Sequence, residues 1–326
     1  MTILIDERCI RSLVTMDDAL AAVEEVFRAQ GTGENGGVTN VPRVRVPVKN
    51  GVVRITAAVL SYRGYYGVKI SSTAVFGRDA GRMFCLYREA DGALVAIVQV
   101  FAMGAMRTGA ASGVATKYLA NEDATVLAVI GTGRQARTQI EAVCKVRAIR
   151  EVRVYSRSAD NRERFCAAFE NAHERIKFIP LDSAEHTVRG ADIVIAATPS
   201  EQPVMLGAWL KPGAHINAIG ANYEHRRELD VDVVRAAKFI CVDDIEQVRY
   251  EATDLVAPVK AGLLGWDDVH PLADVVAGNV RGRTSREDIT LFKSLGVALE
   301  DVALAAMAYE KAVAQGVGTP LPDLAG

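Results

Sequence analysis

Two groups of residues in this sequence have types and spacings that could do chemistry. The first is a glycine-spaced turn with the pattern GxGxxA, made of Gly131, Thr132, Gly133, Arg134, Gln135 and Ala136. It follows the apolar run at residues 126–130 and opens a stretch of helix-forming residues. Such a turn between a strand and a helix is typical of a dinucleotide site, because free N–H groups at the helix start face the pyrophosphate.

Each small residue of the turn has an expected role. Gly131 permits the tight turn, Gly133 lets the backbone approach a pyrophosphate, and Ala136 lets the helix pack on the strand. The strand, the turn, the helix and the next strand lie in register, which is a stronger signal than the glycines alone. The alternative is a Rossmann-like fold that uses its glycines only for packing. We predict a dinucleotide site.

The end of the second strand indicates which dinucleotide binds. An NAD site has Asp or Glu there to accept a hydrogen bond from the ribose 2′-hydroxyl. Here the strand EVRVYS at residues 151–156 ends in Ser156 and is followed by Arg157. A hydroxyl beside an arginine suits a 2′-phosphate, so NADP(H) is the preferred cofactor and NAD(H) remains possible. The alternative is that Arg157 is only a solvated loop charge.

The second group consists of cations that precede the turn: Arg43 and Arg45 in VPRVRVP, Lys69 in GVKISS, and Arg107. Strand alternation directs Lys69 to the face opposite to its apolar neighbours. Most lysines in strands face solvent, which is the alternative for Lys69. Arg107 stands near the start of an expected helix over residues 105–120, where the helix dipole disfavours a cation. Its position indicates an anionic partner, either a substrate carboxylate or a nearby Asp or Glu.

Composition limits the function classes. The chain has 326 residues and a net charge of −2, which gives no reason to expect nucleic acid or a membrane surface as a partner. Its length suggests about two domains. The five cysteines are dispersed without CxxC spacing, as expected for reduced thiols in a cytoplasmic protein, and neither the cysteines nor the histidines suggest a metal site. The N-terminus lacks the apolar run of a signal peptide.

The elements that must position these residues can be read from the pattern of apolar residues. Thr15 and Asp18 form an approximate capping box for a helix that should end at Gly31. Residues 41–98 have the apolar pattern of several β-strands without helices between them, which suggests an antiparallel or mixed sheet. The residues EADG indicate a hairpin turn. After residue 120, segments typical of helices alternate with apolar runs at 125–130, 151–156, 191–198, 214–220 and 237–244.

This alternation predicts an α/β fold with a doubly wound, parallel Rossmann sheet. The last helix, over residues 296–316, is expected to rejoin the first domain. We therefore predict a dinucleotide-binding domain at 120–295, inserted into an α+β domain made of residues 1–119 and 296–326.

Four segments together resemble the ornithine cyclodeaminase and mu-crystallin family: MRTGAASGVATKYLA, the GTGRQA turn, INAIGANYEHRRELD and ITLFKSLGVALEDVA. The resemblance covers nearly the whole chain and keeps the order of the motifs. It implies that the domain of residues 1–119 and 296–326 binds the substrate and forms a homodimer, that the Rossmann domain binds NAD(P), and that the chemistry takes place at the α-carbon of amino or imino acids.

The resemblance also assigns residues. The arginine that binds the substrate carboxylate falls on Arg43 or Arg45, with Arg43 preferred because it follows the proline. The active-site lysine falls on Lys69, and a second carboxylate-binding arginine falls on Arg107. Asn222 would hydrogen-bond near the reacting nitrogen. Thr198 would touch the cofactor, and the nicotinamide would be covered by Ser294, Leu295 and Gly296.

Two departures from the family pattern bear on activity. Cyclodeaminases of the family carry an aspartate where this sequence has Asn222, and an amide cannot exchange a proton as a carboxylate does. Met83 falls where the family often has a threonine near the nicotinamide. The mixed charges of YEHRRELD, residues 223–230, suggest a solvated helix entry.

The pattern favours an NAD(P)H-dependent reductase that converts a cyclic imine of the 1-pyrroline-2-carboxylate type into the amino acid. Between two arginines, the pKa of Lys69 should be lowered. The alternatives are an ornithine cyclodeaminase, an amino acid dehydrogenase of the alanine dehydrogenase type, and an NADPH-dependent binding protein with little turnover.

Overall fold

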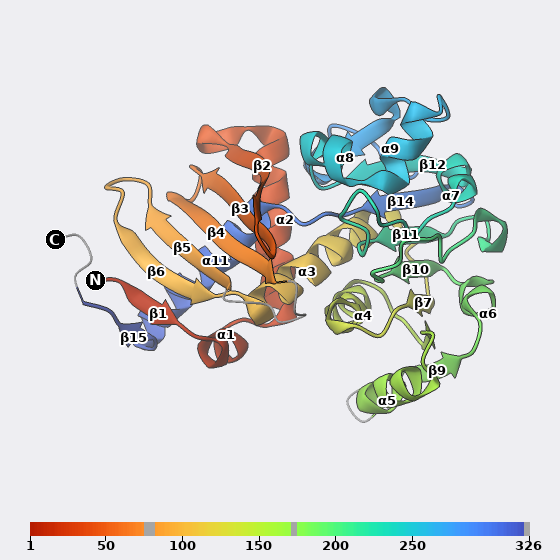
Figure 1. Ribbon diagram of the computed structural model, residues 1–326, viewed down its shortest axis with the longest axis horizontal. Helices are drawn as coiled ribbons and strands as arrows, with labels where there is room; N and C mark the ends of the chain where they lie inside the picture. The colour runs from red at the N-terminus through yellow and green to blue at the C-terminus, as the bar shows by residue number, and fades with distance from the viewer. Residues whose placement is uncertain (75–81, 171–174, 323–326) are drawn as a thin grey trace. The chain divides into compact units, whose positions relative to one another are not determined.

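The computed structural model describes residues 1–74, 82–170 and 175–322. The chain forms two compact units (Figure 1). Unit 1 comprises Met1–Thr108 and Gly296–Gly326, and unit 2 comprises Gly109–Leu295. The first boundary falls inside helix α3 (Phe101–Leu119), so that one helix contributes to both units. The assignment of a separate function to each unit stays a prediction.

Unit 1 is built on a mixed seven-stranded sheet, as the crowded strands predict. Its order is β15-β1-β6-β5-β4-β3-β2, antiparallel from β2 to β6, with β1 parallel to β6. The sequence pattern did not reveal the two short terminal strands, which pair with each other (Figure 1). The strands are β1 (Ile3–Ile5), β2 (Val38–Val48), β3 (Gly51–Leu60), β4 (Tyr65–Ala74), β5 (Arg82–Arg88), β6 (Leu94–Gln99) and β15 (Thr319–Pro320).

Helices cover one face of this sheet. The last long helix, α11 (Ala298–Gln315), packs on β3, β4 and α2 and so rejoins the first part of the chain as predicted (Figure 1). The capping box of Thr15 and Asp18 is confirmed at the start of α2 (Met16–Thr32). The helix ends at Thr32, and Gly33 rather than Gly31 caps it, because Gly33 adopts the left-handed conformation with φ 67°. The remaining helices of this unit are α1 (Glu7–Leu13) and the short η1 (Glu34–Gly36).

Helix α3 begins at Phe101, four residues before the predicted start. The cause is a distant cap, since the Glu7 carboxylate accepts hydrogen bonds from the backbone N–H groups of Phe101 and Ala102. A carboxylate at this end also complements the helix dipole. Arg107 therefore lies in the second turn of the helix, and its expected position at a helix start is wrong.

Unit 2 is a doubly wound α/β domain, as predicted. Its eight strands run in the order β13-β12-β14-β11-β10-β7-β8-β9, and every neighbouring pair is parallel. The predicted strands are present, whereas β9, β13 and β14 were not predicted. The strands are β7 (Val126–Ile130), β8 (Glu151–Tyr155), β9 (Lys177–Leu181), β10 (Ile193–Ala196), β11 (His215–Ala218), β12 (Ala237–Val242), β13 (Val269–Pro271) and β14 (Ile289–Lys293).

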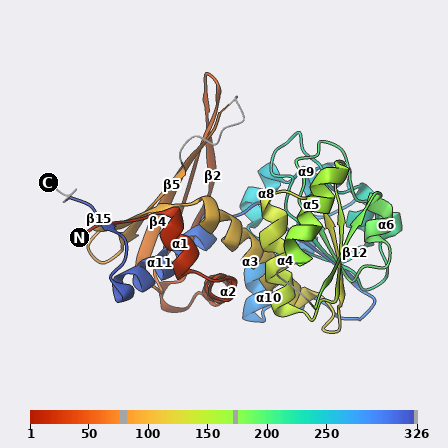
Figure 2. The ribbon, with the colours of Figure 1, turned by 90° about the horizontal axis from the view of Figure 1, so that it is seen from below.

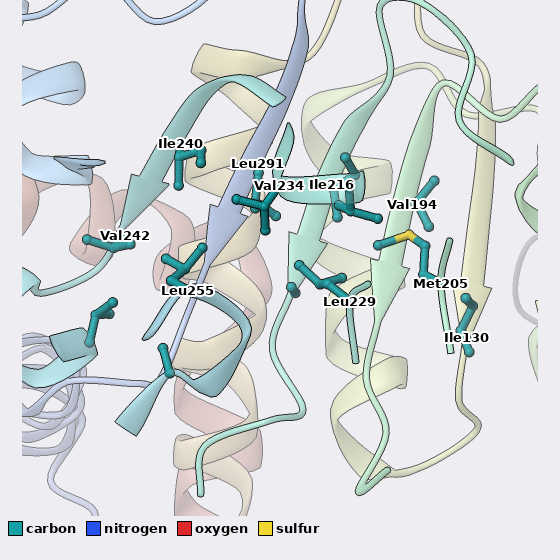
Figure 3. Packing of buried hydrophobic residues seen from close by; sticks show 14 of the residues in the cluster. Ile130, Val194, Met205, Ile216, Leu229, Val234, Ile240, Val242, Leu255 and Leu291 are labelled. Atoms are coloured by element: carbon teal, nitrogen blue, oxygen red, sulfur yellow. The ribbon is translucent and has the colours of Figure 1, made fainter. Parts of the chain in front are cut away.

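Both faces of this sheet are buried. Alternate residues of β7 enter different apolar clusters, with Leu127 and Val129 on one side and Ala128 and Ile130 on the other. Figure 2 shows α5 and α6 on opposite sides of the strands, and Figure 3 shows the core that contains Ile130, Ile216 and Leu291. Burial on both faces explains why the strands read as nearly continuous apolar runs.

The helices of unit 2 are mostly short: α4 (Arg134–Val146), α5 (Ala159–Glu170), α6 (Ala184–Val188), α7 (Val231–Ala236), α8 (Ile245–Glu251), α9 (Thr253–Lys260), α10 (Leu272–Ala277), η2 (Gly207–Trp209) and η3 (Trp266–Asp268). Within the part of the chain that the structure describes, no helix has the length and apolar character needed to cross a membrane.

Candidate functional site

In unit 1 the structure gathers Lys69, Arg107 and Arg43 around the first turn of α11. The Lys69 ammonium pairs with the Asp301 carboxylate. Arg107 Nη1 lies 2.7 Å from Glu300 Oε2, and its Nε lies 3.1 Å from Asp301 Oδ1. Arg43 Nη2 donates to the carbonyl oxygen of Gly296 at 2.8 Å. These five side chains are called the charge cluster below.

The register of the sheet explains why these residues meet. Lys69 on β4 stands opposite Thr56 on β3, and a β-bulge between Val41 and Val44 leaves Arg43 beside Thr56. Arg45 lies two positions further along β2, opposite Arg54. Of the two candidate arginines, Arg43 therefore joins the cluster around Lys69.

The same register corrects the expectation for Met83. Met83 pairs with Ile70, whereas Phe84 pairs with Lys69. Because neighbouring residues of a strand point to opposite faces, Met83 lies on the face opposite to Lys69. Its side chain is 45% exposed, whereas Phe84 is fully buried. Phe84 is therefore the residue of β5 that stands beside Lys69 on the face of the charge cluster.

Burial shapes the titration of the cluster. The pKa of Lys69 is lowered to about 8: burial is the main cause, and the charges of Arg107 and Arg43 act in the same direction against the opposing effect of Asp301. The predicted direction is confirmed, although burial rather than like charge is the main cause. Burial tends to raise the pKa of Asp301, but Arg107 and Lys69 outweigh it and hold that pKa below its usual value.

The two acids of the cluster, Glu300 and Asp301, were not predicted from the sequence. Glu300 and Asp301 are fully buried at the start of α11, where acids complement the helix dipole. A pair of adjacent acids in the otherwise apolar stretch 298–308 was the available signal. Three cations face two carboxylates here, so the cluster carries one net positive charge and suits a ligand with one negative charge.

In unit 2 the glycine turn has the geometry of a phosphate cradle. Gly131 has φ 114°, and its N–H donates to the Tyr155 carbonyl oxygen at 2.8 Å. A Cβ on Gly131 would lie 2.4 Å from the Ala197 carbonyl oxygen, so the position requires glycine. Gly133 is the N-cap of α4, and apart from Gly133 and its two chain neighbours no described heavy atom comes within 4 Å of where its Cβ would be. Ala136 is fully buried against the sheet.

The turn lies at the point where the strand order reverses. β7 stands between β10 and β8, and ligands of such sheets bind at the carboxyl ends of the strands on either side of this point. Ser156 and Arg157 follow β8, and Thr198 follows β10. The Ser156 hydroxyl donates to the Ser158 carbonyl oxygen at 2.9 Å, and Arg157 is exposed. Together with the open space at Gly133, this arrangement fits a dinucleotide.

The other predicted residues of unit 2 also follow carboxyl ends of strands. Asn222 is half-buried after β11. Ser294 and Leu295 follow β14 and both donate to Asp243 Oδ2, at 3.0 Å from the hydroxyl and 2.7 Å from the backbone nitrogen.

The segment 223–230 departs from its prediction. Glu228 within it is fully buried, and its carboxylate accepts hydrogen bonds from Thr198. The solvated helix entry expected for this segment is therefore wrong at Glu228, whose charge alone gave no sign of burial.

The chain is similar in sequence and in fold to proteins of known activity. The chain is 35% identical to an alanine dehydrogenase of Archaeoglobus fulgidus over 98% of both chains. The Δ1-pyrroline-2-carboxylate reductase of Thermococcus litoralis, solved with NADH and L-proline, is 35% identical, with a TM-score of 0.92 over 98% of this chain and 100% of that one. An archaeal alanine dehydrogenase dimer with bound NAD is 34% identical, with a TM-score of 0.91 over 98% and 99%.

These homologues are NAD-dependent oxidoreductases that act on amino or imino acids, which is the class of enzyme that the resemblance predicts. The sequence also matches the sequence pattern of the ornithine cyclodeaminase/mu-crystallin family over residues 2–316, nearly the whole chain. The chain belongs to the ornithine cyclodeaminase/mu-crystallin family.

Proposed function

We propose that this protein reduces the C=N bond of an imino acid with a nicotinamide cofactor, and that a cyclic ketimine such as 1-pyrroline-2-carboxylate is a substrate. The charge cluster of unit 1 is the observation that carries the proposal. Its single net positive charge suits the carboxylate beside the imine carbon. The similarity to a reductase solved with NADH and L-proline supports the same chemistry.

In this proposal the charge cluster binds the substrate carboxylate. Arg43 and Arg107 supply planar donors, which match a carboxylate better than an ammonium does. Thr56 supports a ligand at this place, because its buried hydroxyl has no hydrogen-bond partner among the described residues and lies beside Lys69. A buried hydroxyl without a partner costs about 1–3 kcal/mol, which a bound carboxylate would relieve.

Proton supply follows from the pKa of Lys69. An ammonium whose pKa is about 8 can hold the carboxylate and also release a proton near neutral pH. The imine carbon gains a hydride and the nitrogen gains a proton, so the product is the amino acid. Asn222 is proposed to hydrogen-bond near that nitrogen. When bound, the nicotinamide cofactor supplies the hydride.

The residues that would hold the cofactor are those of the glycine turn, with Thr198 and the segment 294–296 near the nicotinamide. The homologues bind NAD(H), and we propose that this chain also accepts NADP(H). The absence of a carboxylate at the end of β8, with Arg157 exposed there, supports this proposal. Arg157→Asp should lower NADPH affinity without lowering NADH affinity, as measured by fluorescence titration.

We also propose a homodimer. Val44, Ile55, Ile70 and Met83 are successive cross-strand partners on β2 to β5, on the face opposite to Lys69 and α11. Val44, Ile70 and Met83 are 49%, 48% and 45% exposed. Monomers rarely expose contiguous apolar surface of this kind. The similar archaeal alanine dehydrogenase is a dimer. Light scattering should report a dimer that Ile70→Asp dissociates.

Two other reactions remain candidates. Reductive amination of pyruvate is favoured by the alanine dehydrogenase relative. Cyclodeamination of ornithine is named by the family, and Asn222 argues against it because an amide cannot transfer a proton.

One assay separates these reactions. Oxidation of NADH and NADPH is followed with 1-pyrroline-2-carboxylate, its six-membered homologue, and pyruvate with ammonia, and ornithine is tested with NAD. We expect rapid oxidation of NADH or NADPH with a cyclic imine. With ornithine and NAD we expect no proline, which a cyclodeaminase would form. Rapid oxidation with pyruvate and ammonia but not with cyclic imines would assign an alanine dehydrogenase. Binding of cofactor without turnover of any substrate would indicate a binding protein.

A further inference from the structure

Glu228 occupies an unusual position at the carboxyl edge of the parallel sheet of unit 2. Its side chain is fully buried, and each of its two carboxylate oxygens accepts two hydrogen bonds. Oε1 accepts from the Thr198 backbone nitrogen at 2.6 Å and from the Thr198 hydroxyl at 2.9 Å. Oε2 accepts from the backbone nitrogens of Gly220 and Ala221 at 2.7 and 3.1 Å.

These four donors belong to two different loops. Thr198 follows β10, and Gly220 and Ala221 follow β11, the next strand of the sheet. The loops also touch each other, since a Cβ on Gly220 would lie 2.1 Å from the Thr198 carbonyl oxygen. One carboxylate therefore fixes the conformation of two neighbouring loops.

The position of these loops connects them to the dinucleotide turn. Gly131 lies against the β10 loop, because its Cβ would meet the Ala197 carbonyl oxygen. In a doubly wound sheet the adenosine ribose lies toward the second strand, here β8. The other half of a dinucleotide must then extend over β10 and β11, where Glu228 holds the loops.

Glu228 is itself held by charged residues. Asp254 Oδ1 accepts from the backbone nitrogens of Glu228 and Leu229 at 2.9 and 3.0 Å. Lys293 Nζ lies 3.1 Å from Asp254 Oδ2, and both side chains are fully buried. Leu229 and Leu255, next to these acids in the chain, point into the apolar core of Figure 3. A buried carboxylate is costly unless it is hydrogen-bonded, so Glu228 requires the four donors that its two oxygens have.

We propose that Glu228 is a positioning residue that holds the loops after β10 and β11 in the conformation that receives the nicotinamide half of the cofactor. This rests on the proposed function, because it assumes that the crevice binds a nicotinamide dinucleotide. Glu228 acts through Thr198 and through the loop that leads into Asn222.

Glu228→Gln removes one of the two hydrogen-bond acceptors of the side chain with little change in its volume. The amide nitrogen cannot accept a hydrogen bond, so one loop loses its acceptor and meets a second donor instead. Asp192→Asn is the matched control. The Asp192 carboxylate accepts from the backbone nitrogens of Thr125 and Val126, both at 2.8 Å, at the amino end of the same sheet.

The experiment compares both variants with the wild type in three measurements: the melting temperature, the fluorescence emission and Kd of bound NADH, and kcat and KM for 1-pyrroline-2-carboxylate. We expect both variants to melt at lower temperature. Glu228→Gln alone should change the emission of bound NADH and lower kcat by about 10- to 100-fold, the effect of a misplaced reacting group, with KM for the imine near the wild-type value. Asp192→Asn should keep the wild-type emission and kcat.

Equal behaviour of the two variants in emission and kcat would overturn the proposal and leave Glu228 a stabilising tie only. If Glu228→Gln does not fold, Glu228→Asp keeps the charge but is too short to reach both loops, and the same changes are expected from it in weaker form. If the wild type binds NADH but reduces no imine, the proposed function fails, while the emission and Kd of bound NADH still decide the role of Glu228. A wild type that does not bind NADH would overturn both.

Discussion

The charge cluster of unit 1 consists of charged side chains that pair with one another, whereas the glycine turn of unit 2 presents backbone groups and glycines. In unit 1, Arg107 and Lys69 both pair with the buried Asp301, so removal of either cation leaves a buried carboxylate with one partner fewer. In unit 2, the space around Gly131 and Gly133 must stay free of side-chain atoms. Loss of a side chain should therefore harm the first region, and gain of a single methyl group should harm the second.

The largest effect is expected from Arg107→Met. This change leaves Glu300 and Asp301 buried without their shared arginine, and breaking a buried pair costs about 3–5 kcal/mol of unfolding free energy. The loss should appear in urea denaturation. Substrate turnover should also disappear, while NADH should still bind to the folded protein because the glycine turn is unchanged.

Arg63→Met is the control for this comparison. Arg63 pairs with Glu310 at 2.6 Å, but Glu310 is 43% exposed. Water can solvate that carboxylate after the change, so the expected loss is about 0–1 kcal/mol. Equal losses for the two variants would show that burial of Glu300 and Asp301 does not set the stability of the charge cluster.

An intermediate effect is expected in unit 2 from Gly131→Ala. The left-handed conformation with φ 114° and the contact with the Ala197 carbonyl oxygen should cost about 1–3 kcal/mol and abolish NADH binding. Gly133→Ala provides the sharper comparison. Gly133 has φ −78° and open space around it, so stability should change by less than about 1 kcal/mol. NADH affinity should still fall, because the new methyl group occupies the cradle. Unchanged affinity in isothermal titration would contradict the phosphate site.

The contrast between the regions also explains what the sequence could predict. The turn at 131–136 was readable because its strand, glycines and helix are neighbours in the chain. Lys69 and Asp301 are 232 positions apart, and Arg107 and Glu300 are 193 apart, so no local pattern connects them. The resemblance to a family supplied Lys69 and Arg107, but not their acidic partners.

Three errors have the same physical origin, which is a contact between residues far apart in the chain. The start of α3 depends on Glu7, which lies 94 positions before Phe101. The side of the sheet on which Met83 lies depends on strand register, where a shift of one residue exchanges the two faces. Glu228 was misjudged because its charge suggested solvent, whereas its donors are in the loops after β10 and β11.

The smallest expected effect concerns pH and sharpens the view of unit 1 as a site governed by burial. The pKa of Lys69 is about 8 in the folded protein, below its ordinary value of 10.5. As pH rises through about 8, Lys69 loses the proton with which it attracts a carboxylate. The kcat/KM for the imine should then fall by about tenfold per pH unit.

Lys69→Arg tests this origin, because an arginine stays protonated in this range. The variant should be slower, but its kcat/KM should no longer fall near pH 8. Titration of the imine itself would persist in both proteins, so a fall in kcat/KM that remains in Lys69→Arg would be assigned to the substrate.

The free energy of unfolding gives a second test of the pKa of Lys69, and it should change with pH in the opposite direction to kcat/KM. Between about pH 8 and 10.5 the unfolded chain binds more protons than the folded one at Lys69, so this residue should make the free energy of unfolding rise with pH, and the rise should be absent in Lys69→Arg.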